Sequence, residues 1–157
     1  MSTIDEHRPT IVSHSSRVEV LVTSFGYLHL HAADPPPAAV LVDVREHLRD
    51  PHTDPAFRAL TGHDVAVMER VLSTPGAGAL IDAVVAAAAA LLPAACRIGR
   101  LVRIAVGCAG GRHRSVVIAD AVAARLALTG WGAEAEHWHL HKPVVARLNG
   151  VTEPQPP

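Results

Sequence analysis

The stretch 107-GCAGGRHRSVVIA-119 decides how this chain folds, because it joins a predicted strand to a predicted helix through a glycine-rich turn. The apolar, β-branched residues of 101–106 (LVRIAV) before the turn are typical of a strand. The apolar spacing of 115–129 after the turn indicates a helix, and Gly130 follows it as a typical helix stop. A strand that passes directly into a helix is one half of a parallel β–α–β unit.

The same alternation of strand and helix extends outward from this unit. Two helices are predicted before it, at 64–73 and 77–92, and the second is expected to stop at Pro93. Three more apolar segments are predicted to be strands: 17–23 (RVEVLVT), 40–44 (VLVDV, apolar on both faces like a buried strand) and 133–140 (AEAEHWHL). Short joints favour parallel pairing, so we expect an α/β layered domain with a small, mainly parallel sheet flanked by helices.

Composition limits the classes of protein to which this chain can belong. Its 157 residues suffice for one domain with a buried core, and because 49% are apolar but only 3% aromatic, Ala, Val, Leu and Ile must build that core. A net charge of −1 provides no general attraction for nucleic acids. Two cysteines are too few for a disulfide scaffold and the N-terminus lacks a hydrophobic segment, so we expect a cytoplasmic protein.

The two ends of the chain differ from its middle. We expect residues 1–16 to be a flexible N-terminal segment and residues 143–157 to be a flexible Pro-rich tail, on either side of a folded domain of residues 17–142. The longest apolar run, 83–95, is interrupted by Pro93 and is shorter than a membrane span, so no membrane association is expected.

Polar or glycine-rich segments follow three of the predicted strands, at 24–27, 45–62 and 107–114. Ligands of open α/β sheets bind where loops leave the carboxyl ends of the strands. The second segment is part of a long loop without predicted structure, and such loops are usually functional or disordered. We therefore expect the three segments to form one composite site.

The glycine turn itself has the features of an anion site. Gly110 and Gly111 allow close approach of backbone N–H groups, and the following helix N-terminus favours negative charge, so phosphate is the expected guest. Arg112 and Arg114 would add charged donors, and Ser115 a hydroxyl. The alternative is a tight turn whose glycines serve packing alone. No Walker A sequence occurs in the chain.

Cys108 and Arg114 also match the Cys-x5-Arg spacing of cysteine-dependent phosphatases, in which a thiolate attacks phosphorus. Those enzymes usually have histidine before the cysteine, where this chain has Gly107, and only Asp50 and Asp54 are candidates for a general acid. The favoured alternative is that Cys108 is a small buried residue at the end of a strand. No catalytic residue is assigned, except Cys108 if the protein is a phosphatase.

The turn also resembles a longer motif. Residues 107–116 (GCAGGRHRSV) are similar to the sequence Gly-Cys-Thr-Gly-Gly-x-His-Arg-Ser-Val in the C-terminal domain of the RapZ family of bacterial RNase adapter proteins. Other groups of residues agree with family motifs in the same order: Ser24-Phe25-Gly26-Tyr27, Asp43-Val44-Arg45 with Pro51-His52, and Leu60-Thr61-Gly62. The resemblance covers roughly residues 17–142, and several motifs in one order make it far more specific than Cys-x5-Arg alone.

The resemblance implies a non-catalytic domain that senses a phosphorylated metabolite. In the better-known members this domain binds glucosamine-6-phosphate, a small regulatory RNA and an RNase, and it self-associates into oligomers. Full-length members carry a P-loop nucleotide-binding domain before it, so nucleotide hydrolysis is not implied for these residues, and no cofactor is expected. The phosphate would be held by Gly107, Cys108, Ala109, Gly110, Gly111, Arg112, His113, Arg114 and Ser115. The rest of the ligand pocket would be lined by Ser24, Phe25, Gly26, Asp43, Arg45, His52, Thr61 and Gly62.

The chain departs from the family pattern in two places. Ala109 stands where the family has threonine, which removes one hydroxyl that could contact phosphate. The C-terminal end carries only Lys142 and Arg147 where RNA-binding members have a basic cluster. Because phosphate contacts dominate RNA affinity, the second departure argues against RNA binding.

Asp43 and Arg45 are two residues apart on a predicted strand, so their side chains share a face. They form either a simple ion pair, or a site in which Asp43 binds a sugar hydroxyl or amine while Arg45 contacts an anion. The sequence leaves both interpretations open.

The chain contains eleven histidines, which is a high number. His137, His139 and His141 alternate, so on a strand they would share one face and could bind zinc or copper. An exposed or interface face is the favoured alternative, and no metal is expected. His52 and His113 lie in the expected site, where each could donate to phosphate or to sugar hydroxyls.

Overall fold

The computed structural model describes residues 17–31 and 33–145, and its centre is a four-stranded sheet in which all neighbouring strands are parallel. The strands lie in the order β2-β3-β1-β4. Their bounds are β1 (Val20–Gly26), β2 (Val40–Asp43), β3 (Val102–Cys108) and β4 (Ala133–His137). The segments predicted to be flexible, 1–16 and 143–157, fall outside the described residues except for 143–145.

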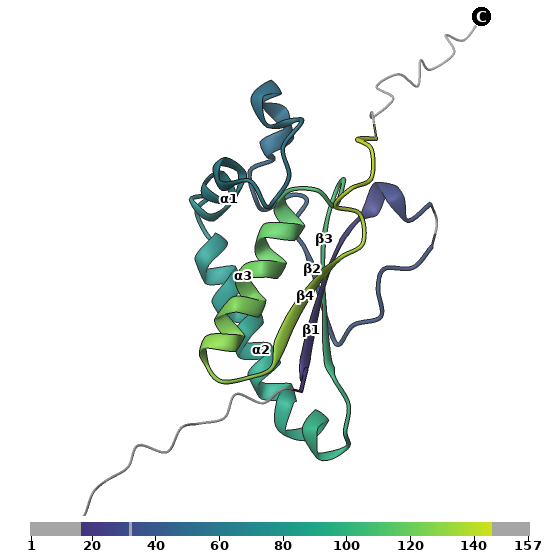
Figure 1. Ribbon diagram of the computed structural model, residues 1–157, viewed down its shortest axis with the longest axis vertical. Helices are drawn as coiled ribbons and strands as arrows, with labels where there is room; N and C mark the ends of the chain where they lie inside the picture. The colour runs from purple at the N-terminus through teal and green to yellow at the C-terminus, as the bar shows by residue number, and fades with distance from the viewer. Residues whose placement is uncertain (1–16, 32, 146–157) are drawn as a thin grey trace, which may run out of the picture.

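Three helices lie on one face of this sheet (Figure 1): α1 (Val65–Leu72), α2 (Ala77–Arg97) and α3 (Arg114–Leu128). The connections from β2 to β3 and from β3 to β4 step across the sheet in the same direction, so right-handed crossovers put their helices on the same side. The connection from β1 to β2 steps the other way. It runs along the opposite face and carries only the short 3-10 turn η1 (Tyr27–His29). The predicted α/β layered fold with a parallel sheet is confirmed.

The core lies between the sheet and the helices. Helix-facing side chains of β1 and β3 are buried against α2 and α3, and they include Val20, Val22, Val102, Ile104 and Val106. Aliphatic side chains make up nearly all of this cluster, as the composition predicts. The buried layer fixes the carboxyl ends of β1 and β3 side by side, because Gly26 pairs with Cys108 at the end of the ladder.

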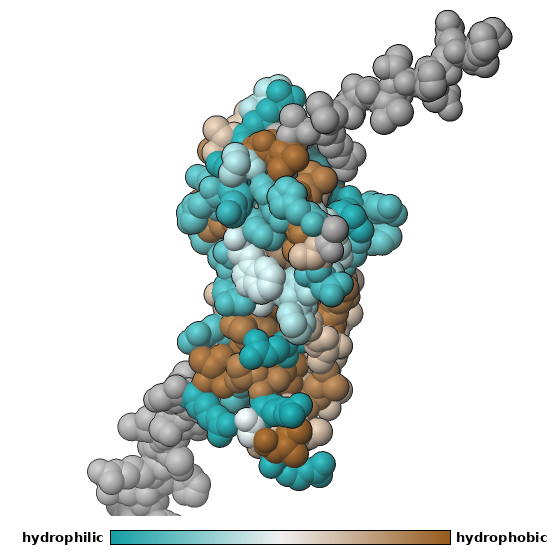
Figure 2. Space-filling model, turned by 90° about the vertical axis from the view of Figure 1, so that its right-hand side faces the viewer, coloured by the Kyte–Doolittle hydropathy of each residue, from teal (hydrophilic) through white to brown (hydrophobic). Residues whose placement is uncertain are grey.

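Among the described residues, no α-helix lies over the opposite face of the sheet. Strand β2 is an edge strand, and Leu41 on it is 52% exposed. The prediction that this strand is buried on both faces is therefore wrong, because the helices cover only one side. Figure 2 shows the helix-free side of the molecule, with apolar side chains gathered over its lower part and more polar ones above.

Helix α2 is longer than predicted. The expected stop at Pro93 is wrong, because the helix continues through this residue to Arg97. Proline removes one backbone donor, which leaves the carbonyl of Ala89 without its helical partner, but both residues are exposed and water can take the carbonyl's hydrogen bond. The resulting helix of 21 residues is long and apolar enough to cross a membrane by length and composition, unlike the run expected from the sequence. In this fold one of its faces lies in the core.

The strands that border the site also differ from their predicted bounds. Strand β1 begins at Val20 and runs on to Gly26, so Ser24-Phe25-Gly26 is strand and not turn. Strand β4 ends at His137, where its pairing with β1 ends, and not at Leu140. The long loop after β2 contains two 3-10 turns, η2 (Pro51–Thr53) and η3 (Pro55–Phe57), although the sequence predicts no structure there.

Candidate functional site

The glycine turn lies against the end of β1. Gly111 has a φ of 69°, and a Cβ on it would lie 2.5 Å from the backbone nitrogen of Gly26. A Cβ on Gly26 would in turn collide with the backbone of Gly110. Only glycine fits at these two contacts, so the turn and the strand end touch through their backbones, as expected for a site built from backbone groups.

Cys108 points into the interior of the turn. Its Sγ accepts a hydrogen bond from the N–H of Gly111 (3.2 Å) and lies 3.1 Å from Oγ of Ser115. Cys108 and Ser115 are both buried. The sulfur therefore occupies the N–H of Gly111, one of the donors that the sequence predicts for a phosphate, and the hydroxyl of Ser115 is directed into the fold.

Arg114 is directed away from the turn and into the loop that follows β2. Its side chain is only 4% exposed. Nη1 donates to the carbonyls of Arg45 (2.7 Å), Leu48 (3.1 Å) and Val44 (3.3 Å), and Nη2 donates to Oδ2 of Asp50 (2.8 Å). The guanidinium expected to hold phosphate instead holds the backbone of this loop.

The side chains of the other two basic residues of the turn also point toward the loop between β2 and α1. Nε and Nη2 of Arg112 donate to the carbonyls of Leu60 and Ala59, each at 3.0 Å. Nε2 of His113 lies 2.8 Å from the same carbonyl of Leu60. Together with Arg114, these side chains connect the glycine turn to the loop between β2 and α1, which is how the structure brings the separate sequence segments together.

The backbone of the turn provides donors of its own. Within the described residues, the N–H groups of Ala109 and Gly110 donate to no protein acceptor, and both residues are half-buried. The turn leads into α3, whose 15 residues give it a substantial dipole at its N-terminus. These groups make a local positive region that does not depend on the three basic side chains.

Asp43 and Arg45 form an ion pair at the end of β2, with Nη2 of Arg45 2.6 Å from Oδ2 of Asp43. The guanidinium also lies 3.7 Å above the ring of Tyr27. The hydrogen bonds from Arg45 hold the pKa of Asp43 below its usual value, and desolvation, with the nearby Asp43 carboxylate, raises the pKa of Tyr27. Both members of the pair are well exposed, so a ligand can reach them.

Ser24 and Phe25 lie on opposite faces of β1 and cannot line the same wall. Ser24 is buried on the helix side, where its Oγ lies 2.7 Å from Nδ1 of His137. Phe25 is buried on the other side, edge-on to the ring of Tyr27 with ring centroids 4.8 Å apart. Within this motif, Phe25 packs against Tyr27, whose ring lies under the guanidinium of Arg45, whereas Ser24 lies on the other side of the sheet.

The segment 61–62 contacts the turn through its backbone. The N–H of Gly62 donates to the carbonyl of Arg112 (2.8 Å), and the hydroxyl of Thr61 donates to Oδ2 of Asp64 (3.0 Å). Hydrogen bonds from Thr61 lower the pKa of Asp64. The backbone of His52 lies in η2, and its side chain is outside the described part of the structure.

The three alternating histidines do not share one strand face, because β4 ends at the first of them. His137 turns toward α3, while Nδ1 of His139 accepts a hydrogen bond from the N–H of Gly26 (2.9 Å). Burial lowers the pKa of His139. The sequence places Tyr27 in the expected composite site through segment 24–27 but not among the pocket-lining residues, and it does not place His139 there. Their contacts come from chain segments brought together by the sheet, and only the alternation of histidines gave a signal.

Comparison with known proteins gives one consistent result. Residues 18–141 match the family described as the RapZ C-terminal domain. A protein of Rubrobacter xylanophilus called "Nucleotide-binding protein" is 40% identical over 131 residues, which are 83% of this chain and 42% of the relative. A protein of the same name from Trichlorobacter lovleyi is also 40% identical, over 82% of this chain and 44% of its own length. The chain thus spans less than half the length of these relatives.

Proposed function

This chain belongs to the RapZ C-terminal domain family, and from that premise we propose that it is a non-catalytic regulatory domain that binds a phosphorylated metabolite. The ligand class is a phosphosugar such as glucosamine-6-phosphate. The observation that carries the proposal is the glycine turn, with two unpaired backbone donors at the N-terminus of α3 beside the exposed Asp43–Arg45 pair.

The phosphate end of the ligand is proposed to bind the backbone of the turn. The N–H groups of Ala109 and Gly110 donate to no protein acceptor in the described part of the chain, and the N-terminus of α3 adds its partial positive charge. Contacts of Arg112 and Arg114 with loop carbonyls keep the surrounding loop in place, so little ordering is needed when the ligand binds. In this proposal the arginines shape the site, and the backbone contacts the anion.

The sugar end is proposed to lie over the carboxyl end of β2. Asp43 is paired with Gly107 in the sheet, directly before the turn, so the end of β2 lies next to the start of the turn. A carboxylate beside an exposed guanidinium suits a ligand that has hydroxyl or amino groups as well as a negative charge. The two interpretations of this pair from the sequence are compatible, because an exposed ion pair can exchange partners at small cost.

A phosphatase is the less favoured function. In that mechanism the arginine must contact the phosphate, but Nη1 and Nη2 of Arg114 are committed to three carbonyls and Asp50. Cys108 is buried, and its sulfur lies beneath the turn. Two features do suit a thiolate: the N–H of Gly111 donates to the sulfur, and the turn leads into the N-terminus of α3.

We also propose a cytoplasmic location and self-association. Binding of RNA and of an RNase is the part of the proposal with the least support. The relatives named for nucleotide binding are more than twice as long as the matched region, so that property is not transferred to this chain. In the described part of its C-terminal end, Lys142 is an exposed cation, and a single cation provides little attraction for the phosphates of RNA.

Calorimetry with glucosamine-6-phosphate and with inorganic phosphate tests the proposal. Gly110→Pro removes one of the two unpaired donors, whereas Gly110→Ala keeps it, and a Cβ at this position meets no atom within 4 Å. We expect the proline variant to weaken binding at least about tenfold, since a hydrogen bond to a charged group contributes about 1.5–3 kcal/mol, and the alanine variant to bind nearly as the parent does. Absence of binding at millimolar concentrations of both ligands, or equal binding by both variants, would refute the proposal.

A further inference from the structure

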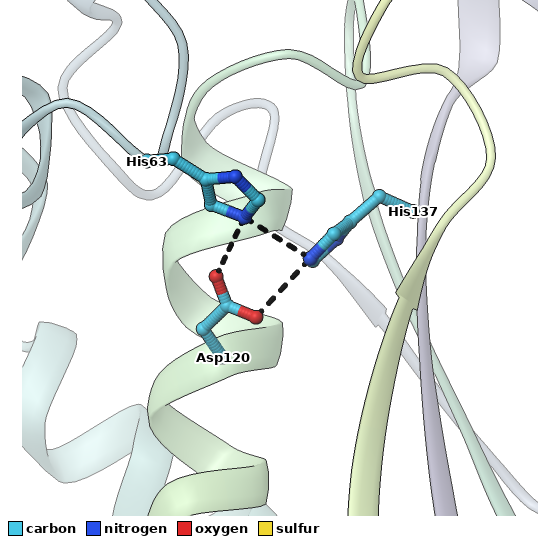
Figure 3. A group of neighbouring side chains, drawn as sticks. All are labelled: His63, Asp120 and His137. Carbon is cyan, nitrogen blue, oxygen red and sulfur yellow. Dashed lines mark hydrogen bonds and ion pairs between the residues drawn. The ribbon is translucent and has the colours of Figure 1, made fainter.

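Three potential metal ligands converge on the helix side of β4, outside the anion site (Figure 3). His63 comes from the segment before α1, Asp120 from α3 and His137 from the end of β4. Nε2 of His63 lies 3.2 Å from Oδ2 of Asp120, and Nε2 of His137 lies 3.1 Å from Oδ1 of the same carboxylate. The two Nε2 atoms are 3.4 Å apart.

These separations match the spacing of ligands around a tetrahedral metal ion. With metal–nitrogen and metal–oxygen distances of about 2.0–2.1 Å, tetrahedral geometry puts neighbouring ligand atoms about 3.3 Å apart. All three pairs of atoms are close to that value. The two imidazoles face different oxygens of the Asp120 carboxylate. One ligand atom from each of the three residues lies within 4.8 Å of the others, so small side-chain rotations bring all three residues into contact with a single ion.

Ser24 supports His137 in the way that outer-shell groups support metal-bound histidines. Its Oγ lies 2.7 Å from Nδ1 of His137, on the opposite side of the ring from Asp120. With Nδ1 donating to this hydroxyl, the lone pair is on Nε2, which is the atom that faces the cluster. Ser24 itself is fully buried, so the orientation of the ring is fixed from inside the fold.

The cluster is partly open to solvent. The side chain of His137 is 13% exposed, that of Asp120 39% and that of His63 52%. An ion held by three protein ligands in this position would keep at least one coordination position for water, as sites of three protein ligands commonly do. Two imidazoles and one carboxylate suit borderline divalent ions such as Zn²⁺ and Co²⁺ better than Mg²⁺ or Ca²⁺, which prefer oxygen ligands.

We propose that His63, Asp120 and His137 bind one divalent first-row transition-metal ion, with Zn²⁺ as the best-suited occupant. The alternative is a set of hydrogen bonds without a metal. In that case Nε2 of His63 and Nε2 of His137 face each other beside the carboxylate of Asp120. The ion would connect three segments of the chain, and one of them follows Gly62, which is hydrogen-bonded to the glycine turn. This inference is independent of the proposed phosphorylated ligand.

Titration of the chelator-treated, full-length chain with Co²⁺ and Zn²⁺ tests the site. We expect one equivalent of Co²⁺ to produce visible d–d absorption, and one equivalent of Zn²⁺ to displace it. His63→Gln and Asp120→Asn each remove one ligand from a partly exposed position, so both variants should fold and bind Zn²⁺ at least about tenfold more weakly. Thermal unfolding without metal checks that they fold.

His47→Gln is the matched control, because His47 is an exposed histidine outside the cluster and this chain has many histidines. It should bind Zn²⁺ as the parent does. The proposal is overturned if the parent binds no Co²⁺ or Zn²⁺ at stoichiometric micromolar concentrations. It is also overturned if His63→Gln and Asp120→Asn bind as tightly as His47→Gln, because the ion is then held elsewhere.

Discussion

At the scale of single residues, the arginines of the glycine turn have a role different from the one their charge indicates. Arg114 provides donors to three backbone carbonyls and one carboxylate in a place where water is excluded. A guanidinium is suited to this because its donors have a fixed planar arrangement. A buried carbonyl without a partner costs more than the hydrogen bond gains, so this one side chain controls the conformation of the loop after β2.

We predict that Arg114→Met lowers the free energy of unfolding by about 3 kcal/mol, because it removes the donor to buried backbone carbonyls and the ion pair with Asp50. Arg125→Met is the matched control. Its ion pair with Asp82 is exposed on both sides, so its loss should cost less than about 1 kcal/mol. Urea unfolding monitored by circular dichroism measures both. Equal stability of the two variants would show that the loop does not depend on Arg114.

The single tyrosine provides a second prediction at this scale. Desolvation and the Asp43 carboxylate raise the pKa of Tyr27, and Arg45 opposes them. Asp43→Asn should therefore lower the pKa of Tyr27, and Arg45→Met should raise it, in a titration of tyrosinate absorbance. The folded state holds the phenol proton more tightly than the unfolded chain does, so the stability it contributes is present below about pH 10 and is lost above that. Shifts of the same sign in both variants would contradict the arrangement.

At the scale of elements, the sequence predicts what periodicity and steric rules control, and it fails where neighbouring elements decide. The strand-turn-helix unit around Gly110 is confirmed, because a β-branched run, a glycine turn and an amphipathic stretch each have a local cause. The predicted end of α2 was wrong, because the proline rule assumes that the carbonyl that loses its helical donor has no other partner. Strand β4 was predicted too long because the alternation of histidines continues after its pairing with β1 has ended.

The candidate site shows the same difference between features with a local cause in the sequence and features that neighbouring elements decide. The motifs predict Gly26 and Gly111 as residues of the site. The physical reason for glycine at both positions is a backbone contact that only glycine permits. The directions of Arg112, His113 and Arg114 could not be predicted, because they depend on carbonyls of a loop some 50 to 70 residues away in sequence. Asp120 gave no signal at all, because an aspartate on a helix surface is ordinary until the sheet places histidines beside it.

The course of α2 through Pro93 is testable at this scale. Pro93→Ala should raise the free energy of unfolding by about 1–3 kcal/mol, because it restores one helical hydrogen bond and removes the proline clash. Ala94→Gly, at the next exposed position, should instead lower it by about 1 kcal/mol. Both effects require that 93 and 94 are helical. If neither substitution changes the denaturation midpoint, the helix ends before Pro93.

At the scale of the whole molecule, the two cysteines distinguish its surface from its interior. Cys96 is exposed near the end of α2, and Cys108 is buried where the sheet meets α3. Cys108 can therefore react with an alkylating reagent only when that junction opens, so its labelling reports on the stability of the central fold.

We predict that iodoacetamide labels Cys96 in the native protein and Cys108 only on unfolding, as measured by mass spectrometry of peptides. Partial desolvation and the Glu19 carboxylate raise the pKa of the Cys96 thiol, so its thiolate is scarce at neutral pH. Glu19→Gln should lower that pKa and accelerate its labelling. Labelling of Cys108 as fast as Cys96 in the native state would mean that the junction is not closed.

The carboxyl end of β1 contacts both the glycine turn and the cluster that contains His137. Gly26 touches the glycine turn and donates to His139, and two residues earlier Ser24 holds the ring of His137. One short stretch of strand thus lies between the glycine turn and the ring of His137. Any linkage between an occupant of the turn and an ion at His137 must be reciprocal: whatever factor one occupant imposes on the affinity of the other, the second must impose on the first.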